Sequence, residues 1–264
     1  MQSSNRPVAL VTGASSGIGA AMARELARHG HDLVLSARRT APMQTLAEEL
    51  RGLGASATIL PADLAEPGAV AALVREIDAA GVEIEVLVNN AGLGAIGRFA
   101  QIDPVRDAEI MQVNIVALTE LTRLLLPPML ARKHGKIVLV ASTASFLPCP
   151  NMAVYAASKA YVRSFGEALA QELAGSGVGV NVLCPGTTQT EFFAVAGSVP
   201  SALQARRMMT AEDVAHIAYR GMARGERVTI AGLANRVLAF AATHTPHFLT
   251  LPTTERMMRR SEPR

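Results

Sequence analysis

Tyr155 and Lys159 stand four residues apart in the stretch VYAASKA (154–160), a spacing that places two side chains on one face of a helix. A free phenol has a pKa near ~10 and is a poor acid–base catalyst at neutral pH. A cation within a few ångströms favours the phenolate, so Lys159 would lower the pKa of Tyr155 and make it a usable general acid or base. The alternative is a surface lysine with a tyrosine packed on its stem.

A glycine-rich turn, TGASSGIG (12–19), leaves one apolar stretch and opens an Ala-rich one. Its three glycines permit a tight turn, a close approach of helix to strand, and room for a pyrophosphate beside the free N–H groups of a helix start. The spacing is GxxxGxG rather than the common GxGxxG, and a purely structural turn is the alternative. The residues of this turn that we expect to contact a dinucleotide are Gly13, Ser15, Ser16, Gly17, Ile18 and Gly19.

The stretch LSARRT (35–40) ends the second apolar run and distinguishes between two cofactors. NAD sites usually carry an acidic residue there for the ribose 2′-OH, whereas an arginine accommodates the 2′-phosphate of NADP. Arg38 and Arg39 without an acid favour NADP(H), with Arg38 on the phosphate; two solvated arginines are the alternative. Asp63, followed by Leu64 after the third apolar run, is placed to accept from an adenine amine or to cap the next helix.

The elements that must hold these residues alternate along the chain. Apolar runs typical of strands lie at 7–13, 31–37, 56–63, 84–92, 135–142, 177–186 and 226–232, and helical patterns such as 67–80 and 104–131 separate them. This alternation indicates a doubly wound, Rossmann-like α/β fold with a parallel sheet covered on both faces. We expect a single domain over 1–264, with a core at about 7–232, a lid at 187–210 and a C-terminal helical tail at 233–264.

Composition narrows the class of protein. Hydrophobic residues make up 50% and charged residues 18% of the 264, which is typical of a folded protein. A formal charge of +3 does not argue for a nucleic-acid partner. Cys149 and Cys184 make no disulfide framework and the N-terminus has no signal-peptide run, so we expect a cytoplasmic protein. His244 and His247 lack a third ligand, so we expect no metal.

Several motifs together resemble the short-chain dehydrogenase/reductase family. They are TGASSGIG, NNAG (89–92), Asn114, Ser142, YAASK (155–159) and PG (185–186), and they span about 7–232. The resemblance implies an oxidoreductase that moves a hydride between NAD(P)(H) and a carbonyl or alcohol. It implies that Tyr155 protonates the carbonyl oxygen during reduction, and that Lys159 lowers the pKa of Tyr155 and binds the nicotinamide ribose.

The resemblance implies further roles. Ser142 would hold and polarise the substrate oxygen, with Thr143 or Ser145 as the alternative hydroxyl. Asn114 would anchor a water that links Lys159 to solvent, or would bond back within its own helix. The remaining residues that the resemblance places around the cofactor are Asn89, Asn90, Ala91 and Gly92 along one wall, Pro185, Gly186 and Thr188 over the nicotinamide, and Thr190 at its carboxamide.

Three loops, at 93–99, 144–152 and 187–210, should surround the reacting carbon. Their apolar side chains are Leu93, Ile96, Phe99, Phe146, Leu147, Met152, Phe192, Phe193 and Val195. Few charges accompany them, so we expect an apolar, medium-sized ketone or aldehyde, unless these side chains only pack the lid onto the core. Arg98 and Arg206 would recognise a carboxylate or remain solvated.

The tail at 233–264 has apolar residues at helical spacing and a basic end. Packing over the substrate pocket or against a second subunit is favoured over a peripheral membrane contact. The resemblance implies a homodimer or homotetramer formed through helices 104–131 and 152–173. The alternatives of a different class are a catalytically silent NADP(H)-binding regulator and an interaction protein, and the intact Ser142–Tyr155–Lys159 set argues against the former.

Overall fold

Seven parallel strands form the centre of the computed structural model, which describes residues 6–196 and 208–259. They are β1 (Val8–Thr12), β2 (Asp32–Ser36), β3 (Ala57–Ile59), β4 (Ile84–Asn89), β5 (Gly135–Val140), β6 (Val178–Cys184) and β7 (Val228–Ile230). Their order across the sheet is β3-β2-β1-β4-β5-β6-β7. The predicted doubly wound α/β fold is confirmed, although the strands are shorter than predicted, and β3 most of all.

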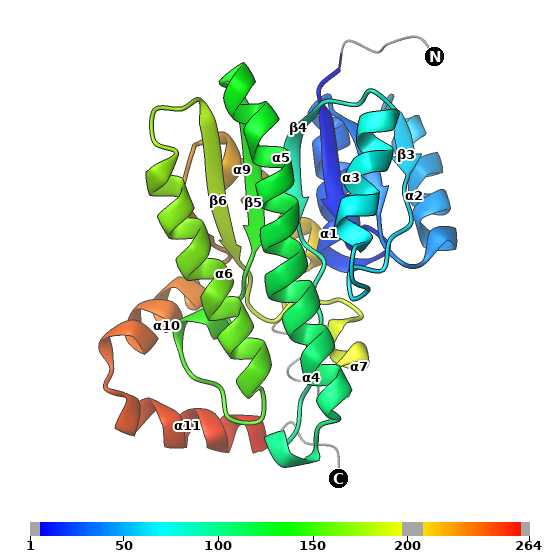
Figure 1. Cartoon of the computed structure of the whole chain (residues 1–264). Coiled ribbons are helices and arrows are strands. Elements are labelled where there is room, and N and C mark those ends of the chain that lie inside the picture. The colour runs from blue at the N-terminus through cyan, green and yellow to red at the C-terminus, as the bar shows by residue number, and fades with distance from the viewer. Residues whose placement is uncertain (1–5, 197–207, 260–264) are drawn as a thin grey trace.

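Helices cover both faces of the sheet, which explains why the central strands are apolar throughout rather than alternating. One face packs against α1 (Gly17–Arg28), α2 (Thr40–Gly52) and α9 (Ala211–Ala223). The other face packs against α3 (Ala69–Ala79), α5 (Leu118–Arg132) and α6 (Ala153–Glu172), which lie toward the viewer in Figure 1. Successive side chains of β1 join opposite cores, since Ala9 and Val11 lie in the first and Leu10 in the second.

The helix predicted at 104–131 is interrupted. It consists of α4 (Pro104–Met111), a π-helical segment (Gln112–Ala117) that contains Asn114, and α5. Pro104–Arg132 is also the one stretch of the described chain that is long and apolar enough to cross a membrane, by length and composition only, and 44% of its most apolar window is buried. Leu121, Leu125 and Met129 of α5 are buried in the core, so the helix has the burial expected of a core helix.

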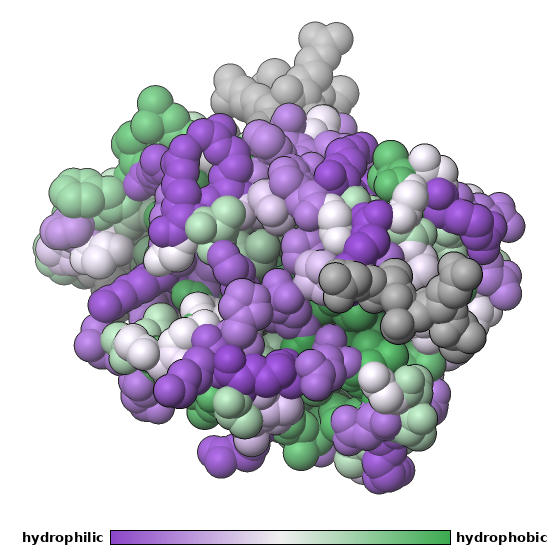
Figure 2. Space-filling model, turned by 90° about the horizontal axis from the view of Figure 1, so that it is seen from above, coloured by the Kyte–Doolittle hydropathy of each residue, from purple (hydrophilic) through white to green (hydrophobic). Residues whose placement is uncertain are grey.

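Two further helices complete the C-terminal part of the described chain. α10 (Leu233–His244) and α11 (His247–Arg259) follow β7 and lie at the lower end of the molecule in Figure 1, the end toward which the strands point. The opposite end, viewed in Figure 2, is largely hydrophilic. The loops after β1, β4 and β5 also meet at the lower end, and the strand order reverses between β1 and β4. Ligands of open α/β sheets bind at such a reversal, outside the carboxyl ends of the strands.

Candidate active site

A cavity of about 990 Å³ lies at the carboxyl ends of the strands. Ligand pockets usually measure roughly 300–1,000 Å³, so this one has room for a large ligand or for two. Of the residues predicted to contact a cofactor, those that line the cavity are Gly13, Ser15, Ser16, Gly17, Ile18, Arg38, Arg39, Asp63, Leu64, Asn90, Ala91, Gly92, Tyr155, Lys159, Pro185, Gly186, Thr188 and Thr190. The fold therefore brings together almost the whole predicted set.

Gly19 and Asn89 are the predicted cofactor residues that lie outside the cavity wall in the described chain. A Cβ at Gly19 would stand 2.3 Å from the Gly13 carbonyl oxygen and 2.5 Å from Asn90 Nδ2, so only a glycine lets α1 approach the first turn so closely. Gly13 and Gly17 have φ of 65° and 54°, which side chains other than glycine rarely adopt. Gly19 thus shapes the cofactor site by close packing.

The start of α1 favours a negative charge. No side chain caps this helix and no acidic residue lies in its first turn. The Glu191 carboxylate reaches the same place and pairs with Arg39 Nη2 at 2.5 Å. The pKa of Glu191 lies below the ordinary value, first because Arg39 donates a hydrogen bond to it; burial opposes this lowering, and a hydrogen bond with Ser16 adds to it by a smaller amount. Free N–H groups, a nearby arginine and the glycine cradle fit the pyrophosphate of a dinucleotide.

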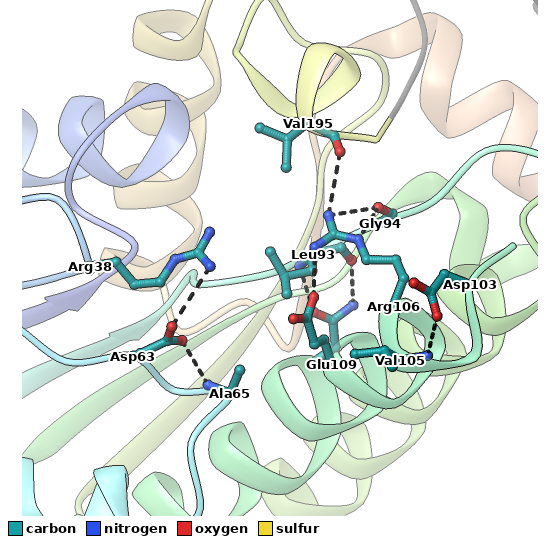
Figure 3. Close-up of polar contacts among 11 residues, drawn as sticks. Arg38, Asp63, Ala65, Leu93, Gly94, Asp103, Val105, Arg106, Glu109 and Val195 are labelled. Carbon is teal, nitrogen blue, oxygen red and sulfur yellow. Dashed lines mark hydrogen bonds and ion pairs between the residues drawn. The ribbon is translucent and has the colours of Figure 1, made fainter.

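Arg38 and Asp63 both line the cavity and point toward each other (Figure 3). Arg38 Nη1 lies 3.8 Å from Asp63 Oδ2, and both side chains are partly exposed. Asp63 Oδ1 accepts a hydrogen bond from the Ala65 amide at 3.1 Å. The alternative of a cap on α3 is wrong, because Gly68 is the N-cap of that helix.

The two asparagines of NNAG point to opposite sides. Asn90 Nδ2 donates to the carbonyl oxygens of Thr12 and Gly13, at 3.0 and 3.3 Å, and so joins the β4 turn to the glycine turn. Asn89 is buried and its Nδ2 donates to Thr122 Oγ1 at 2.9 Å. The prediction that Asn89 lines the cofactor site is wrong, since residues one apart in a strand face opposite sides of the sheet.

Tyr155 lies on the first turn of α6 and is 8% exposed. Burial raises the pKa of Tyr155 to about 12; a hydrogen bond with Ser142 opposes this rise, and Cys149 adds to it. The prediction that the pKa of Tyr155 is lowered is wrong for the protein alone. Burial destabilises the phenolate by more than the Ser142 hydrogen bond stabilises it. Tyr155 is therefore a phenol at neutral pH.

Ser142 is the hydroxyl that meets Tyr155. It ends the β5 loop as the N-cap of a short 3₁₀ turn (Thr143–Phe146), and its Oγ accepts from the Ala144 amide. Thr143 also lines the cavity, whereas Ser145 is buried and donates to the Ser142 carbonyl oxygen at 2.6 Å. The contact with Tyr155 selects Ser142 from the three hydroxyls that the sequence offers.

Lys159 lies one turn further along α6, with its Nζ 5.9 Å from the centre of the Tyr155 ring. The ammonium donates to the Val140 carbonyl oxygen at 2.8 Å. Burial lowers the pKa of Lys159 to about 8, with a smaller opposing effect of Cys184. A Cβ at Gly92 would stand 3.2 Å from this Nζ, so the glycine of NNAG makes room for the ammonium.

Asn114 is fully buried in the π-helical segment, a type of irregularity that is frequent at functional sites. Its Oδ1 accepts from the Leu93 amide at 2.8 Å, and its Nδ2 donates to the Leu93 carbonyl oxygen and to Ser158 Oγ, both at 2.9 Å. The alternative that Asn114 bonds back within its own helix is wrong for its side chain. Asn114 joins the loop after β4 to α6, where Ser158 in turn donates to the Tyr155 carbonyl oxygen at 2.7 Å.

The loop after β6 closes over the cofactor half of the cavity. Thr188 is buried and its hydroxyl donates to the Gly186 carbonyl oxygen. Thr190 lies against Gly17 at the start of α1, where a Cβ on that glycine would come within 3.0 Å of the threonine side chain. Its role at a carboxamide stays a prediction. The part of the predicted lid at 197–207, including Arg206, lies outside the described residues.

The substrate half of the cavity is apolar. Of the side chains predicted there, Leu93, Leu147, Met152, Phe192, Phe193 and Val195 line it. Phe99 is 67% exposed and lies outside the wall, and Phe146 packs into the core beneath Arg163. Ile96 packs beside the wall against the cluster around Tyr155. Arg98 is exposed, which agrees with the alternative that this arginine is solvated.

The C-terminal helices form one wall of the cavity. The sequence predicted that this tail packs over the pocket, but not which of its residues line it. Leu238, Ala241, Ala242 and Thr245 of the α10 segment, and Leu249, Thr250, Thr253 and Thr254 of α11, line the cavity. Asn235 of α10 also lies against Gly186, where a Cβ would stand 2.4 Å from its Nδ2. Helical periodicity signals these helices in the sequence, but it does not show which of their faces meets the cavity.

Comparisons with known proteins agree with this geometry. The chain matches the short chain dehydrogenase family over residues 7–198. The oxidoreductase UcpA of Escherichia coli is 40% identical over 184 residues, which are 69% of each chain. A short-chain dehydrogenase from Sphingobium yanoikuyae in complex with NADPH has a TM-score of 0.80, with 35% identity over 94% of this chain and 95% of that one. A short-chain dehydrogenase/reductase from Burkholderia phymatum in complex with NAD has a TM-score of 0.79, with 28% identity over 91% and 94%.

The chain belongs to the short-chain dehydrogenase/reductase family. The resemblance drawn from its motifs is confirmed, and the protein is an oxidoreductase with a Rossmann-like site for a nicotinamide cofactor. Within residues 6–196 and 208–259, no three His, Cys, Asp or Glu side chains gather closely enough to hold a metal ion. The expected absence of a metal stays a prediction.

Proposed function

We propose that the protein is an NADP(H)-dependent reductase of bulky apolar ketones or aldehydes, which also oxidises the corresponding secondary alcohols. The observation that carries this proposal is the position of Ser142, Tyr155 and Lys159 on one wall of the cavity, between a glycine cradle and an apolar chamber. When bound, the reduced nicotinamide supplies a hydride to the carbonyl carbon.

Tyr155 is the proposed general acid. Because burial raises its pKa to about 12, the phenol carries a proton at neutral pH and can give it to the carbonyl oxygen as that oxygen becomes an alkoxide. Ser142, already hydrogen-bonded to Tyr155, would donate to the same oxygen and orient it. Lys159 would stabilise the phenolate that remains. Asn114 would hold α6, which carries Tyr155 and Lys159, on the loop after β4.

The preference for NADP(H) over NAD(H) rests on Arg38 and Arg39. They follow β2 directly and line the cavity, and no acidic residue stands between Ser36 and Arg39 to bind a ribose 2′-OH. Relatives of known structure hold either cofactor, so the fold alone does not choose. Arg38 is the proposed 2′-phosphate ligand, and phosphate binding would replace its contact with Asp63 at 3.8 Å.

The apolar substrate is inferred from the walls of the chamber. Leu147, Met152 and Phe192 stand beside Tyr155, and Leu238 and Leu249 of the C-terminal helices face them as side chains that are 48% and 53% exposed. An apolar ligand that covers these partly exposed leucines removes apolar surface from water, which favours its binding. The threonines of α11 add acceptor oxygens, since Thr253 and Thr254 donate their protons to backbone carbonyls.

A homodimer or homotetramer in the cytoplasm is the proposed assembly and location. Exposed apolar side chains on the helices expected to associate support it, namely Met111, Val116, Leu124 and Tyr161. A tail that lines the cavity argues against its use as a peripheral membrane anchor. Mass measurement of the purified protein, with and without residues 233–264, tests the assembly and the tail together.

The test of the function is consumption of NADPH and NADH with a panel of apolar ketones and aldehydes, for the wild type and Tyr155→Phe. The expected result is faster turnover with NADPH and a loss of about 10²–10⁴-fold in kcat for Tyr155→Phe. NADPH affinity, measured by titration calorimetry, should change little. Retained activity in the variant would overturn the role of Tyr155, and tight NADPH binding without turnover would favour a regulator.

A further inference from the structure

Arg106 connects three separate segments although it does not itself line the cavity in the described chain. It lies on α4, and Figure 3 shows its guanidinium between Gly94, Val195 and Glu109. Nε and Nη2 donate to the Gly94 carbonyl oxygen at 3.3 and 3.1 Å, and Nη2 also donates to the Val195 carbonyl oxygen at 3.4 Å. Nη1 lies 3.0 Å from Glu109 Oε2, so a carboxylate on the same helix orients the group.

The two carbonyls belong to the two sides of the substrate chamber. Val195 ends α7 (Phe192–Val195), the short helix that places Phe192 over Tyr155 with ring centres 5.2 Å apart. Gly94 lies beneath both rings, since a Cβ there would stand 2.5 Å from Phe192 Cζ and 3.3 Å from Tyr155 Cδ2. The Ile96 amide donates to the Ala196 carbonyl oxygen at 3.1 Å, which adds a direct bond between the same two segments.

We propose that Arg106 is a positioning residue that holds α7 on the 93–97 loop and thereby keeps Phe192 over Tyr155 and the bound substrate. This inference rests on the proposed function. A planar guanidinium suits the task because it points several N–H groups in fixed directions and binds two carbonyls and a carboxylate at once. A lysine retains the charge but concentrates its donors at one atom, so it serves one of the carbonyls at a time.

The role differs from general structural support in what it affects. An arginine that only stabilised the fold would reduce the active fraction, which lowers kcat and leaves KM unchanged. An arginine that keeps the chamber covered contributes binding energy to the substrate, so its loss raises KM. The N-cap of α7, Glu191, is held at the cofactor half by its ion pair with Arg39, which a substitution of Arg106 leaves in place, so NADPH affinity should change little.

Arg106→Met and Arg106→Lys test the proposal, with Arg132→Met as the matched control. Arg132 also binds a backbone carbonyl, that of Ile84 at 3.0 Å, and a glutamate, but it lies at the far end of α5. For Arg106→Met we expect KM for an apolar ketone to rise about tenfold, with kcat within about threefold of wild type. The KM of Arg106→Lys should fall between those of the wild type and Arg106→Met, and the KM of Arg132→Met should match that of the wild type.

Hydrogen exchange followed by mass spectrometry gives a readout without turnover. The amides of Ile96 and Ala196 are hydrogen-bonded, the second to the Phe192 carbonyl oxygen at 2.8 Å, and both should exchange faster in Arg106→Met than in Arg132→Met. Unchanged exchange at these amides, or equal effects of the two methionine variants, would overturn the proposal. If no carbonyl compound is turned over, the proposed function fails, while the exchange measurement still decides whether Arg106 holds α7.

Discussion

The two halves of the cavity are built differently. The cofactor half is made largely of backbone, with glycines at Gly13, Gly17 and Gly92 and loops that follow β1, β4 and β6. The substrate half is made of apolar side chains from segments far apart in the sequence, including Phe192 of α7 and Leu238 of α10. A backbone-built site tolerates almost no added atom, whereas a wall of side chains adjusts its shape one residue at a time.

Gly19→Ala should produce the largest effect, because the added methyl group meets backbone atoms of the cofactor half, which cannot move aside as a flexible side chain can. Its Cβ would stand 2.3 Å from a backbone oxygen, so α1 must move away from the glycine turn. We expect NADPH affinity to fall at least about 100-fold and the melting temperature to fall as well. Gly52→Ala is the control, since a Cβ there has no neighbour within 4 Å. Equal behaviour of the two variants in calorimetry would show that the close contact does not matter.

Lys159 lies at the boundary of the two halves, and its ionisation should make stability depend on pH. Its pKa is about 8 in the folded protein and 10.5 when exposed, so the unfolded chain binds more protons between these values and stability rises with pH there. We expect the difference in unfolding free energy between wild type and Lys159→Met to grow by about 2 kcal/mol from about pH 7.5 to 9.5.

The measurement for Lys159 is urea unfolding at both pH values. Comparing the two proteins removes the opposite contribution of the buried thiols, whose pKa values burial raises to about 11. Lys133→Met, at an exposed position, is the control and should show no such growth. If the difference in unfolding free energy between wild type and Lys159→Met stays constant or shrinks as the pH rises, the shifted pKa of Lys159 is contradicted.

Arg38→Asp tests how the cofactor half distinguishes NADPH from NADH. It removes a cation and places a second carboxylate beside Asp63, so a 2′-phosphate would be repelled. We expect NADPH affinity to fall about 30-fold and NADH affinity to change less than about threefold. Arg51→Asp changes the net charge equally at an exposed position outside the cavity wall. Equal losses for both cofactors would mean that Arg38 does not bind the phosphate.

Leu238→Asp should give the smallest effect and leave the cofactor half intact. Leu238 lines the substrate chamber, whereas Val237 precedes it on α10, is 62% exposed and lies outside the wall. We expect KM for a bulky apolar ketone to rise about tenfold in Leu238→Asp, with unchanged NADPH affinity and little change in Val237→Asp. A similar KM in both variants would remove α10 from the substrate site.

The same contrast explains how far the sequence alone reaches. The alternation of apolar runs with helical patterns predicted the fold, and the glycine spacing and the absence of an acid before Arg38 predicted the glycine turn and the two arginines of the cofactor wall. The rest of that wall was predicted from the resemblance to a family. Tyr155 was found from its spacing to Lys159, which is also local, whereas Ser142 was predicted from the resemblance. The residues predicted locally depend on the backbone conformation near them, which the sequence encodes directly.

The misses depend on which way a side chain faces and on what surrounds it. Asn89 turns into the core at the end of β4, where one residue of register decides the face. Phe146 and Phe99 lie in short 3₁₀ turns, where the first packs into the core and the second faces solvent. The pKa of Tyr155 follows from its burial, which spacing to Lys159 does not show. Arg106 carries no motif, because its partners are backbone carbonyls of distant segments.

The position of α10 and α11 after the seven described strands has a consequence for biosynthesis. A polypeptide leaves the ribosome from its N-terminus, so every strand of the sheet emerges before Leu233 does. The glycine cradle and Tyr155 are then already present, and the nascent chain still lacks the wall formed by Leu238, Leu249 and their neighbours. A message truncated after the codon for Gly232 would therefore encode a protein with its nucleotide-binding turn and its acid–base pair, but with an open substrate chamber.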